Sequence, residues 1–444
     1  MRRLTAWALA LLSAISLHAQ GFDEYFTGET LRLDYVFCGD AVHQEIYLQG
    51  LLKTGEWAGR RDHLGEPLLA GNGQIRMYDT ATGRQIYANS FSTLFQEWQS
   101  YDEAKTVRKA FENCFQLPFP KHPAEVEVVL TDVHHNVSAA LRHPVDPADI
   151  LIRQVEDNRA IRKLLRFGGP LPETIDVVIL SEGYTSREER KFFRDAARAQ
   201  RSLLSSEPYA SHAGSFNFRA VFVPSEDSGP SIPHDAQWHS TLADSHFDTF
   251  YSDRYLTSSS MQKIYDALGT VPFEHIILLV NTPVYGGGGI FNSLTIIGSD
   301  HATFDQVLVH EFGHAFAGLG DESFYDDMSE SMYPADTEPW EPNLTTLVDF
   351  DSKWKDMIPE GTVVPTPVDP IENEADVRRI WHTLSPEQRA SLNLKVGLYE
   401  GGGYQSKGVY RPVQECRMKI NECDVFCPVC TRAILRMIEF CTGR

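Results

Sequence analysis

The sequence predicts an α+β protein in which an N-terminal β-sandwich at residues 21–145 precedes an α/β region at residues 146–444. Short runs that alternate apolar and polar residues, separated by turn residues, fill the first part and are typical of a sandwich. Beyond residue 146, apolar strands alternate with helical patterns, which indicates an α/β sheet. The length of 444 residues allows two or three domains.

Residues 1–20 have the pattern of a signal peptide. Arg2 and Arg3 precede a mainly apolar run at residues 4–17, and residues 18–20 offer a cleavage zone. The run is too short for a comfortable membrane span, and no later run reaches ~18 uninterrupted apolar residues. We therefore expect an exported protein, periplasmic or extracellular, without a transmembrane segment.

The net charge and the cysteine content limit the expected partners and indicate the cellular compartment. The formal net charge of −21 repels nucleic-acid phosphates, so DNA or RNA is not an expected partner. Seven cysteines fit an oxidising compartment, and five of them lie in the last thirty residues, which predicts at least one disulfide there. The CxxC at Cys427 and Cys430 has no second CxxC to complete a zinc ribbon. None of these features predicts an oligomeric state.

The two regions differ in their predicted elements. The strands expected in the sandwich are residues 31–37, 74–78, 85–88 and 125–130, and no catalytic constellation stands among them. Asp146 as N-cap and Pro147 in the first turn predict a helical connector at about residues 147–165. The α/β elements that follow are strands at 175–180, 218–223, 275–280 and 290–297, and helices at 185–204 and 259–268.

We assign a role to each of three loops near these elements. Thr185 and Glu188 form a capping box that opens the helix at 185–204. The glycines at 286–289 lack the Lys-Ser/Thr of a phosphate loop, so we interpret them as a flexible cleft rim, with the strand 290–297 as the edge on which a peptide adds. Ser228 lacks a GxSxG elbow and is assigned to a structural or cleft loop.

The candidate metal ligands and the candidate general base lie in the segment His310-Glu311-Phe312-Gly313-His314. Thr303 and Gln306 predict a capping box for a helix from residue 304 to about 318. Two histidines at i and i+4 project from one helix face and can reach one ion. Glu311, beside the first histidine, can take the proton of a metal-bound water. The pattern predicts one catalytic zinc ion per chain.

Catalytic zinc requires a third protein ligand and an open position. If the helix continued to Asp321, that side chain would lie about 16 Å along the axis from His310, out of reach. The chain must therefore turn, and Gly318 and Gly320 tolerate the backbone angles of such a turn. We predict His310, His314 and Asp321 as metal ligands, with Glu322 as the rival third ligand.

This segment resembles the metzincin motif, in which HExxH is followed by a glycine and by a third ligand three residues later. Gly318 and Asp321 keep that interval, although the glycine comes one residue later and Asp replaces the usual His. Residues 410–418 resemble the metzincin Met-turn, with Met418 as the methionine beneath the metal.

The whole pattern resembles the bacterial IgA metallopeptidase family. The resembling stretches are residues 57–61, 90–95, 181–184, 225–229, 310–322, 410–418 and 426–430. The resemblance implies an N-terminal β domain followed by a metzincin-like catalytic domain. It does not identify immunoglobulin A as the substrate of this protein.

We therefore predict a secreted zinc endopeptidase that hydrolyses protein or peptide substrates with Glu311 as general base. One alternative is a gluzincin-type peptidase whose third ligand is a later glutamate, Glu372 or Glu374. Another is a non-catalytic, zinc-containing adhesion or binding protein, against which Glu311 argues because a purely structural site needs no base there.

Overall fold

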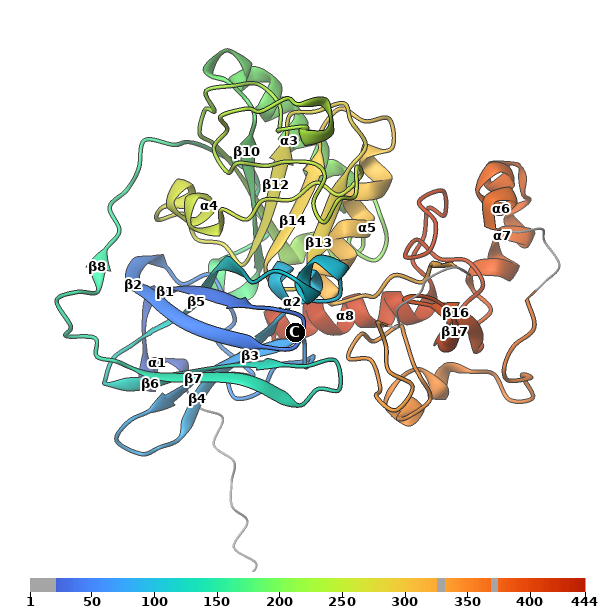
Figure 1. The fold of residues 1–444 in the computed structure, drawn as a ribbon, viewed down its shortest axis with the longest axis horizontal. Coiled ribbons are helices and arrows are strands. Elements are labelled where there is room, and N and C mark those ends of the chain that lie inside the picture. Colours follow the sequence, from blue (N-terminus) through green and yellow to red (C-terminus); the bar gives the residue numbers. More distant parts are fainter. Residues whose placement is uncertain (1–20, 326–331, 369–373, 444) are drawn as a thin grey trace, which may run out of the picture.

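The computed structural model describes residues 21–325, 332–368 and 374–443, so the predicted signal peptide lies outside the described residues. The α+β class is confirmed. Figure 1 shows a β-rich N-terminal part beneath a sheet covered by helices, with the C-terminal helix crossing between the two.

The N-terminal part contains two four-stranded sheets, ordered β5-β1-β2-β8 and β4-β3-β6-β7. Their strands are β1 (Phe26–Gly39), β2 (Gln44–Glu56), β3 (Gly73–Asp79), β4 (Gln85–Phe91), β5 (Lys109–Pro120), β6 (Ala124–Thr131), β7 (Val137–Val145) and β8 (Arg153–Gln154); the helices are α1 (Phe22–Tyr25) and α2 (Leu94–Trp98). Alternate residues of β1, among them Leu33 and Tyr35, share one core with Val126 and Val128 of β6. Two sheets that bury one face each against a common core form a sandwich.

The expected helical connector at residues 147–165 is wrong. These residues form turns, the short strand β8 and the start of β9 (Ile161–Arg166). The carboxylate of Asp146 accepts a hydrogen bond from the backbone N–H of Ala148 (2.9 Å), and that of Asp149 accepts one from Leu151 (2.8 Å). Aspartate side chains stabilise turns through such local bonds as readily as they cap helices.

The second part is built on a six-stranded sheet, ordered β13-β14-β12-β10-β11-β9. Its remaining strands are β10 (Ile175–Glu182), β11 (Phe216–Phe222), β12 (His275–Val280), β13 (Gly287–Ile290) and β14 (Leu294–Gly298); its helices are α3 (Glu189–Leu204), α4 (Met261–Leu268) and α5 (Phe304–Ala317). The four inner strands are parallel, whereas β9 and β13 run antiparallel to their neighbours at the two edges.

Helices cover both faces of this sheet. Ile277 and Leu279 of β12 pack in the core that contains α3 and α5, whereas Ile276 and Leu278 pack in the core that contains α4. Successive strand residues point to opposite faces, so a strand buried on both sides is a continuous apolar run. This explains why β10 and β12 are predicted well from sequence.

The predicted strand 290–297 is divided in two. Residues 287–290 form β13, a turn follows, and β14 begins at Leu294. Asn292 in the turn has φ 51°, a left-handed conformation that asparagine adopts more readily than most residues. The glycine run therefore contributes the edge strand itself.

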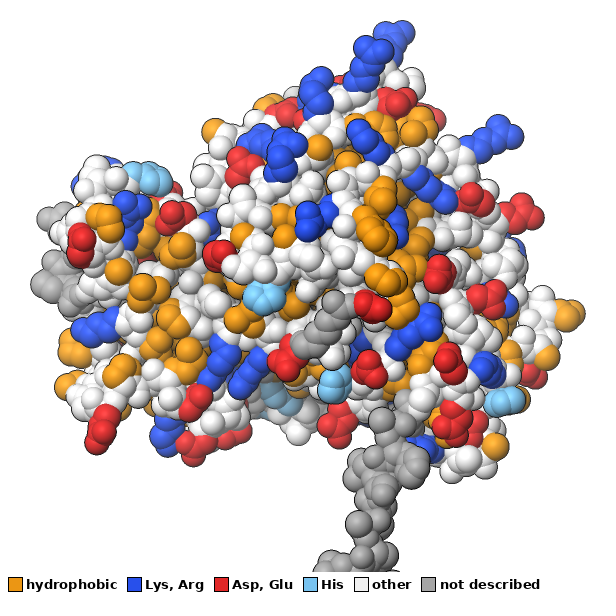
Figure 2. All heavy atoms as spheres, turned by 180° about the vertical axis from the view of Figure 1, so that it is seen from behind, with side chains coloured by type: hydrophobic (Ala, Val, Ile, Leu, Met, Phe, Trp, Pro, Cys, Tyr) orange, Lys and Arg blue, Asp and Glu red, His pale blue; other side chains and the backbone are white. Residues whose placement is uncertain are grey.

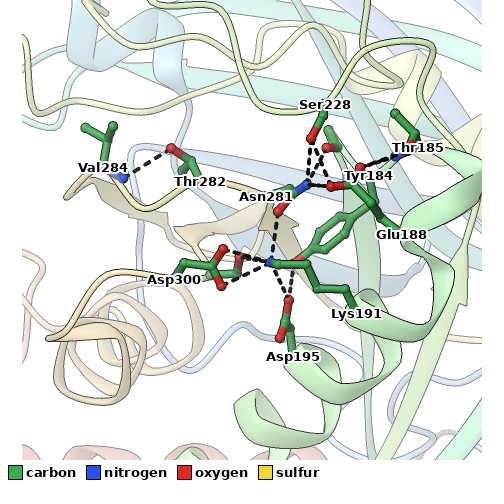
Figure 3. Close-up of polar contacts among 12 residues, drawn as sticks. Tyr184, Thr185, Glu188, Lys191, Asp195, Ser228, Asn281, Thr282, Val284 and Asp300 are labelled. Atoms are coloured by element: carbon green, nitrogen blue, oxygen red, sulfur yellow. Dashed lines mark hydrogen bonds and ion pairs between the residues drawn. The ribbon is translucent and has the colours of Figure 1, made fainter.

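A polar network at the carboxyl ends of β10 and β12 fixes the loops around the sheet (Figure 3). The ammonium group of Lys191 on α3 contacts Asp300 (2.8 Å) and Asn281 (2.9 Å). The Asn281 amide donates to the hydroxyl of Ser228 (3.0 Å), which donates to Glu188 (3.0 Å). The predicted capping box of Thr185 and Glu188 forms. Ser228 thus belongs to a structural loop.

The C-terminal part adds a small sheet, ordered β15-β17-β16, and three helices. These elements are β15 (Phe324–Tyr325), β16 (Tyr399–Gly402), β17 (Tyr404–Arg411), α6 (Glu374–Ile380), α7 (Pro386–Asn393) and α8 (Pro428–Thr442). Near the end of α8, the Phe440 ring lies 4.7 Å from the guanidinium of Arg60, which comes from the N-terminal part.

The surface charge, the search for membrane spans and the state of the cysteines concern the molecule as a whole. Acidic and basic side chains are interspersed over the face shown in Figure 2. Within the described ranges, no helix is long and apolar enough to cross a membrane. The expected C-terminal disulfide is not present, because all seven cysteines are free thiols.

Candidate metal centre

The helix α5 brings the two motif histidines together. The Nε2 atoms of His310 and His314 lie 3.0 Å apart. The helix begins after Thr303, as predicted, but the capping box with Gln306 does not form, because the Thr303 hydroxyl contacts the ring of His301 (2.8 Å) instead.

A turn after α5 returns Asp321 to these histidines. Gly318 ends the helix with φ 62°, the left-handed conformation that glycine adopts without strain. The side chain of Asn343 then holds Gly320 by accepting from its N–H (2.8 Å) and donating to its carbonyl (2.9 Å). The Asp321 carboxylate comes to lie 3.2 Å from Nε2 of His310 and 3.6 Å from Nε2 of His314.

Main-chain carbonyls orient both imidazole rings. Nδ1 of His310 lies 2.9 Å from the carbonyl oxygen of Arg417, and Nδ1 of His314 lies 2.5 Å from that of Leu319. A carbonyl only accepts, so each Nδ1 carries the proton and each Nε2 lone pair is directed at the shared point. This is the arrangement of histidines that bind a metal through Nε2.

Met418 packs against α5. It is fully buried, and a Cβ placed on Gly313 would be 3.1 Å from its sulfur, so the methionine lies against the helix at the residue that precedes His314. Its carbonyl accepts a hydrogen bond from the backbone N–H of Glu322 (2.7 Å). The segment at residues 410–418 therefore contacts the segment that carries Asp321.

The two carboxylates considered for the third ligand, those of Asp321 and Glu322, lie in different groups of potential ligands. Asp321 joins the histidines, whereas the buried Glu322 joins a second group formed by three cysteines. Of the later glutamates considered as alternative ligands, Glu372 lies outside the described residues and the side chain of Glu374 is not described.

Sequence reasoning missed Tyr404. This residue begins β17 with φ 64°, and its hydroxyl donates to Oδ2 of Asp321. It precedes the predicted Met-turn segment and belongs to no motif, so no local signal pointed to it. This hydrogen bond orients the carboxylate of Asp321, the predicted third ligand.

The N-terminal part also reaches the centre, which the sequence did not indicate. Glu97 of α2 accepts a hydrogen bond from the hydroxyl of Tyr255 (2.6 Å). Burial raises the pKa of Glu97 to about 7, and its carboxyl interacts electrostatically with His314, Asp321 and Glu311. The only nearby signal was the resembling stretch 90–95, which leads into α2.

The glycines of β13 allow this edge strand to lie against α5. A Cβ on Gly289 would collide with the carbonyl oxygen of Glu311, and one on Gly287 would be 3.2 Å from Cγ of Glu311. The backbone of Tyr255 forms a parallel bridge with Gly287. The glycine run thus contributes a paired strand set close to the helix, and its role as a cleft rim stays a prediction.

The charges at the centre favour a bound cation. Burial disfavours a charged imidazole, yet the Asp321 carboxylate raises the pKa of His314 to about 9. Burial likewise opposes a charged Asp321, but the two histidines hold its pKa well below the usual range. Burial raises the pKa of Glu311. The donors therefore stabilise positive charge between them, and burial favours the protonated form of Glu311.

The donor set fits zinc. Two imidazole nitrogens and a carboxylate oxygen lie within 4.8 Å of one another. In a tetrahedral site with ligand bonds of about 2.0–2.1 Å, donor atoms are about 3.3 Å apart, close to the three distances found here. Three protein donors leave the fourth position open.

Comparison with known proteins decides the family. Residues 163–438 match the family model described as IgA Peptidase M64, and residues 21–142 match the model described as Peptidase M64 N-terminus. The chain belongs to the IgA peptidase M64 family.

Membership in the M64 family confirms the resemblance inferred from the motifs, and it makes the protein a peptidase. The M64 match includes His310 through Met418, and the match to the M64 N-terminus includes Glu97. No curated protein matches the chain.

Proposed function

We propose that this M64 peptidase is a secreted, zinc-dependent endopeptidase whose metal is held by His310, His314 and Asp321. The observation that carries the proposal is the convergence of two Nε2 atoms and one carboxylate from the two sides of a helix break. We further propose residues 21–145 as a β domain and residues 146–444 as a metzincin-like catalytic domain, with Met418 as the Met-turn residue.

Zinc, when bound, supplies a Lewis acid and lowers the pKa of a coordinated water to about 7. Glu311 acts as the general base that takes the proton of the attacking water and then donates it to the leaving amine. Burial raises its pKa, which strengthens it as a base toward the water proton. Tyr404 keeps Asp321 in place by its hydrogen bond.

An extended peptide can align with β13, the edge strand beside Glu311. A Cβ on Gly288 would be 3.0 Å from the Tyr255 ring, so this ring lies over the strand. We therefore expect the Tyr255 side chain to contact the substrate. The partners are protein or peptide chains, and the net charge of −21 opposes binding to nucleic acids.

Export rests on the signal-peptide pattern of residues 1–20 and makes the periplasm or the extracellular space the site of action. A non-catalytic zinc-containing binding protein remains the alternative from another class. The position of Glu311 beside a metal ligand, with its pKa raised by burial, supports catalysis over structural binding.

The decisive experiment compares the mature protein with Glu311→Gln on a denatured protein substrate. We expect the variant to retain zinc and to lose turnover by ~10²–10⁴-fold, because it lacks the general base. A chelator should abolish cleavage by the parent, and zinc should restore it. Glu360→Gln, at an exposed turn, is the matched control. Full activity of Glu311→Gln would refute the assigned role.

A further inference from the structure

A second group of potential ligands lies behind the proposed catalytic centre. It consists of Glu322, Cys416, Cys427 and Cys430, which we call the Cys/Glu cluster, and all four residues are fully buried. Glu322 follows Asp321 in the chain, Cys416 lies two residues before Met418, and the CxxC cysteines flank the start of α8. Three separate segments thus meet at one point.

The distances in the cluster fit a tetrahedral metal site. All four donor atoms lie within 4.8 Å of one another, and the sulfurs of Cys416 and Cys430 are 3.9 Å apart. Zinc–sulfur bonds of about 2.3 Å separate two sulfurs by about 3.8 Å in a tetrahedron. A disulfide would require about 2.0 Å, so these two thiols are not bonded to each other.

One atom of the cluster is buried without a partner. Oε1 of Glu322 accepts from the Asn343 amide (2.9 Å) and lies 3.2 Å from the sulfur of Cys430. Oε2 of Glu322 has no hydrogen-bond partner in the part of the chain that the structure describes. A buried carboxylate with an unpartnered oxygen is costly, and a cation held by this carboxylate and the three sulfurs would offset that cost.

Backbone groups favour thiolates at this point. The N–H of Cys427 donates to the sulfur of Cys416 (3.3 Å), and the N–H of Cys430 donates to the sulfur of Cys427 (3.4 Å). Cys427 is the N-cap of α8, where the helix dipole stabilises negative charge. Donation toward sulfur stabilises the deprotonated form that binds metal.

We propose that the Cys/Glu cluster is a second metal site, distinct from the catalytic centre, that binds one zinc-like divalent ion. Thiolates select borderline-soft cations such as zinc over magnesium or calcium. Four protein donors fill a tetrahedral shell and leave no open position, which defines a structural rather than a catalytic ion.

The ion ties together the backbone that supports the proposed catalytic centre. Glu322 fixes the segment of Asp321, and Cys416 fixes the segment whose Arg417 carbonyl orients His310 (2.9 Å). This consequence for catalysis rests on the proposed function, whereas metal binding at the Cys/Glu cluster does not.

Metal content of the full mature chain, produced with zinc, tests the proposal. We expect two zinc ions per chain in the parent. His310→Ala should lose the catalytic ion and keep the other, and Cys416→Ser should lose the structural ion. Cys423→Ser is the matched control, because this buried cysteine of the same segment contacts the Val425 carbonyl (3.5 Å) and lies outside the cluster. The control should retain both ions.

A measurement on the parent protein covers the case in which Cys416→Ser does not fold. X-ray absorption at the zinc edge should show sulfur neighbours at about 2.3 Å in the parent and in His310→Ala. Zinc without sulfur neighbours, or a disulfide between cluster cysteines in a non-reduced digest of the native protein, would overturn the proposal. Glu311→Gln should keep both ions, so failure of the proposed catalytic role is distinguishable from failure of this site.

Discussion

At the scale of single residues, neighbouring side chains in the segment after α5 serve different groups. Asp321 faces the histidines and Glu322 faces the cysteines. In an extended segment, successive side chains point to opposite sides, so one short stretch of chain can supply a ligand to each of two centres. Tyr404 on the Asp321 side and Asn343 on the Glu322 side orient the two carboxylates.

Tyr404→Phe should weaken zinc binding at the proposed catalytic centre by ~10–100-fold, because residues that orient a ligand typically contribute this much. Titration against a competing chelator measures the effect. Tyr325→Phe is the control, since Tyr325 stacks on the Tyr404 ring with centroids 6.1 Å apart. Equal zinc affinity in Tyr404→Phe and the parent would show that the hydroxyl does not position Asp321.

The residues of the centre differ in how far sequence could predict them. His310, Glu311 and His314 follow from the spacing of one helix, and Asp321 follows from the reach of a chain that turns at Gly318. Tyr404 and Glu97 come from distant segments, and their contacts depend on how separate elements pack. The Cys/Glu cluster was missed for the same reason, because Glu322 and Cys430 are 108 residues apart.

At the scale of elements, β13 packs closely against α5 because glycines face the helix. Gly289→Ala places a methyl group against the backbone of Glu311. We expect a loss of ~1–3 kcal/mol of stability, typical of overpacking, together with reduced turnover. Thermal unfolding and kcat/KM measure the two effects.

The control for Gly289→Ala is Gly50→Ala in β2, where an added Cβ has no atom within 4 Å. The control should unfold at nearly the parent temperature. If both alanine variants retained stability and activity, the close approach of β13 and α5 would not require glycine.

A titratable residue of β12, His275, packs against the other side of α5. His275 of β12 packs edge-on against the rings of Phe312 and Phe316, with centroids 6.1 and 5.1 Å away. Burial lowers its pKa to about 4, below the value of about 6.5 expected in the unfolded chain. The unfolded state then binds more protons between these two values, so stability falls as the pH drops from about 6.5 toward 4.

His275→Phe should remove this contribution, which amounts to at most about 3 kcal/mol. Unfolding temperatures at pH 7 and pH 5 test the expectation: the parent should lose more stability than the variant. His122→Gln changes an exposed histidine and should behave as the parent does. An equal loss in His275→Phe and the parent would assign the acid sensitivity to other groups.

The elements themselves were predicted where one physical cause dominates. Residues 275–280 are buried on both faces and give an unambiguous strand. The connector at 147–165 was predicted as a helix because Asp and Pro favour both helix starts and turns. Its extended path is set by pairing of β8 with β2, in which Leu52 lies opposite Arg153.

At the scale of the molecule, Arg60 links the sandwich to α8. Its guanidinium lies 4.6 Å from the Tyr87 ring and 4.7 Å from the Phe440 ring, and it donates to the Tyr87 hydroxyl (3.1 Å). A buried cation between two rings and several acceptors joins parts of the chain that are far apart in sequence.

Arg60→Ala should therefore destabilise the whole molecule by ~2–4 kcal/mol, since it removes packing and leaves buried acceptors unpaired. Calorimetry should show a lower unfolding temperature or two separate transitions. Arg108→Ala, at an exposed ion pair with Asp40 (3.3 Å), should change stability by less than ~0.5 kcal/mol. If both variants unfolded at similar temperatures, Arg60 would not be needed to hold the sandwich and α8 together.

The position of Glu97 has a consequence for chimeras that combine the two family-matched segments of different proteins. Its carboxyl belongs to the segment at residues 21–142, yet it interacts with Glu311 and Asp321 of the segment at 163–438. A chimera whose imported sandwich lacked this glutamate would remove a carboxyl group that interacts with the proposed metal centre. We therefore expect the sequence of the sandwich to co-vary with that of the peptidase segment.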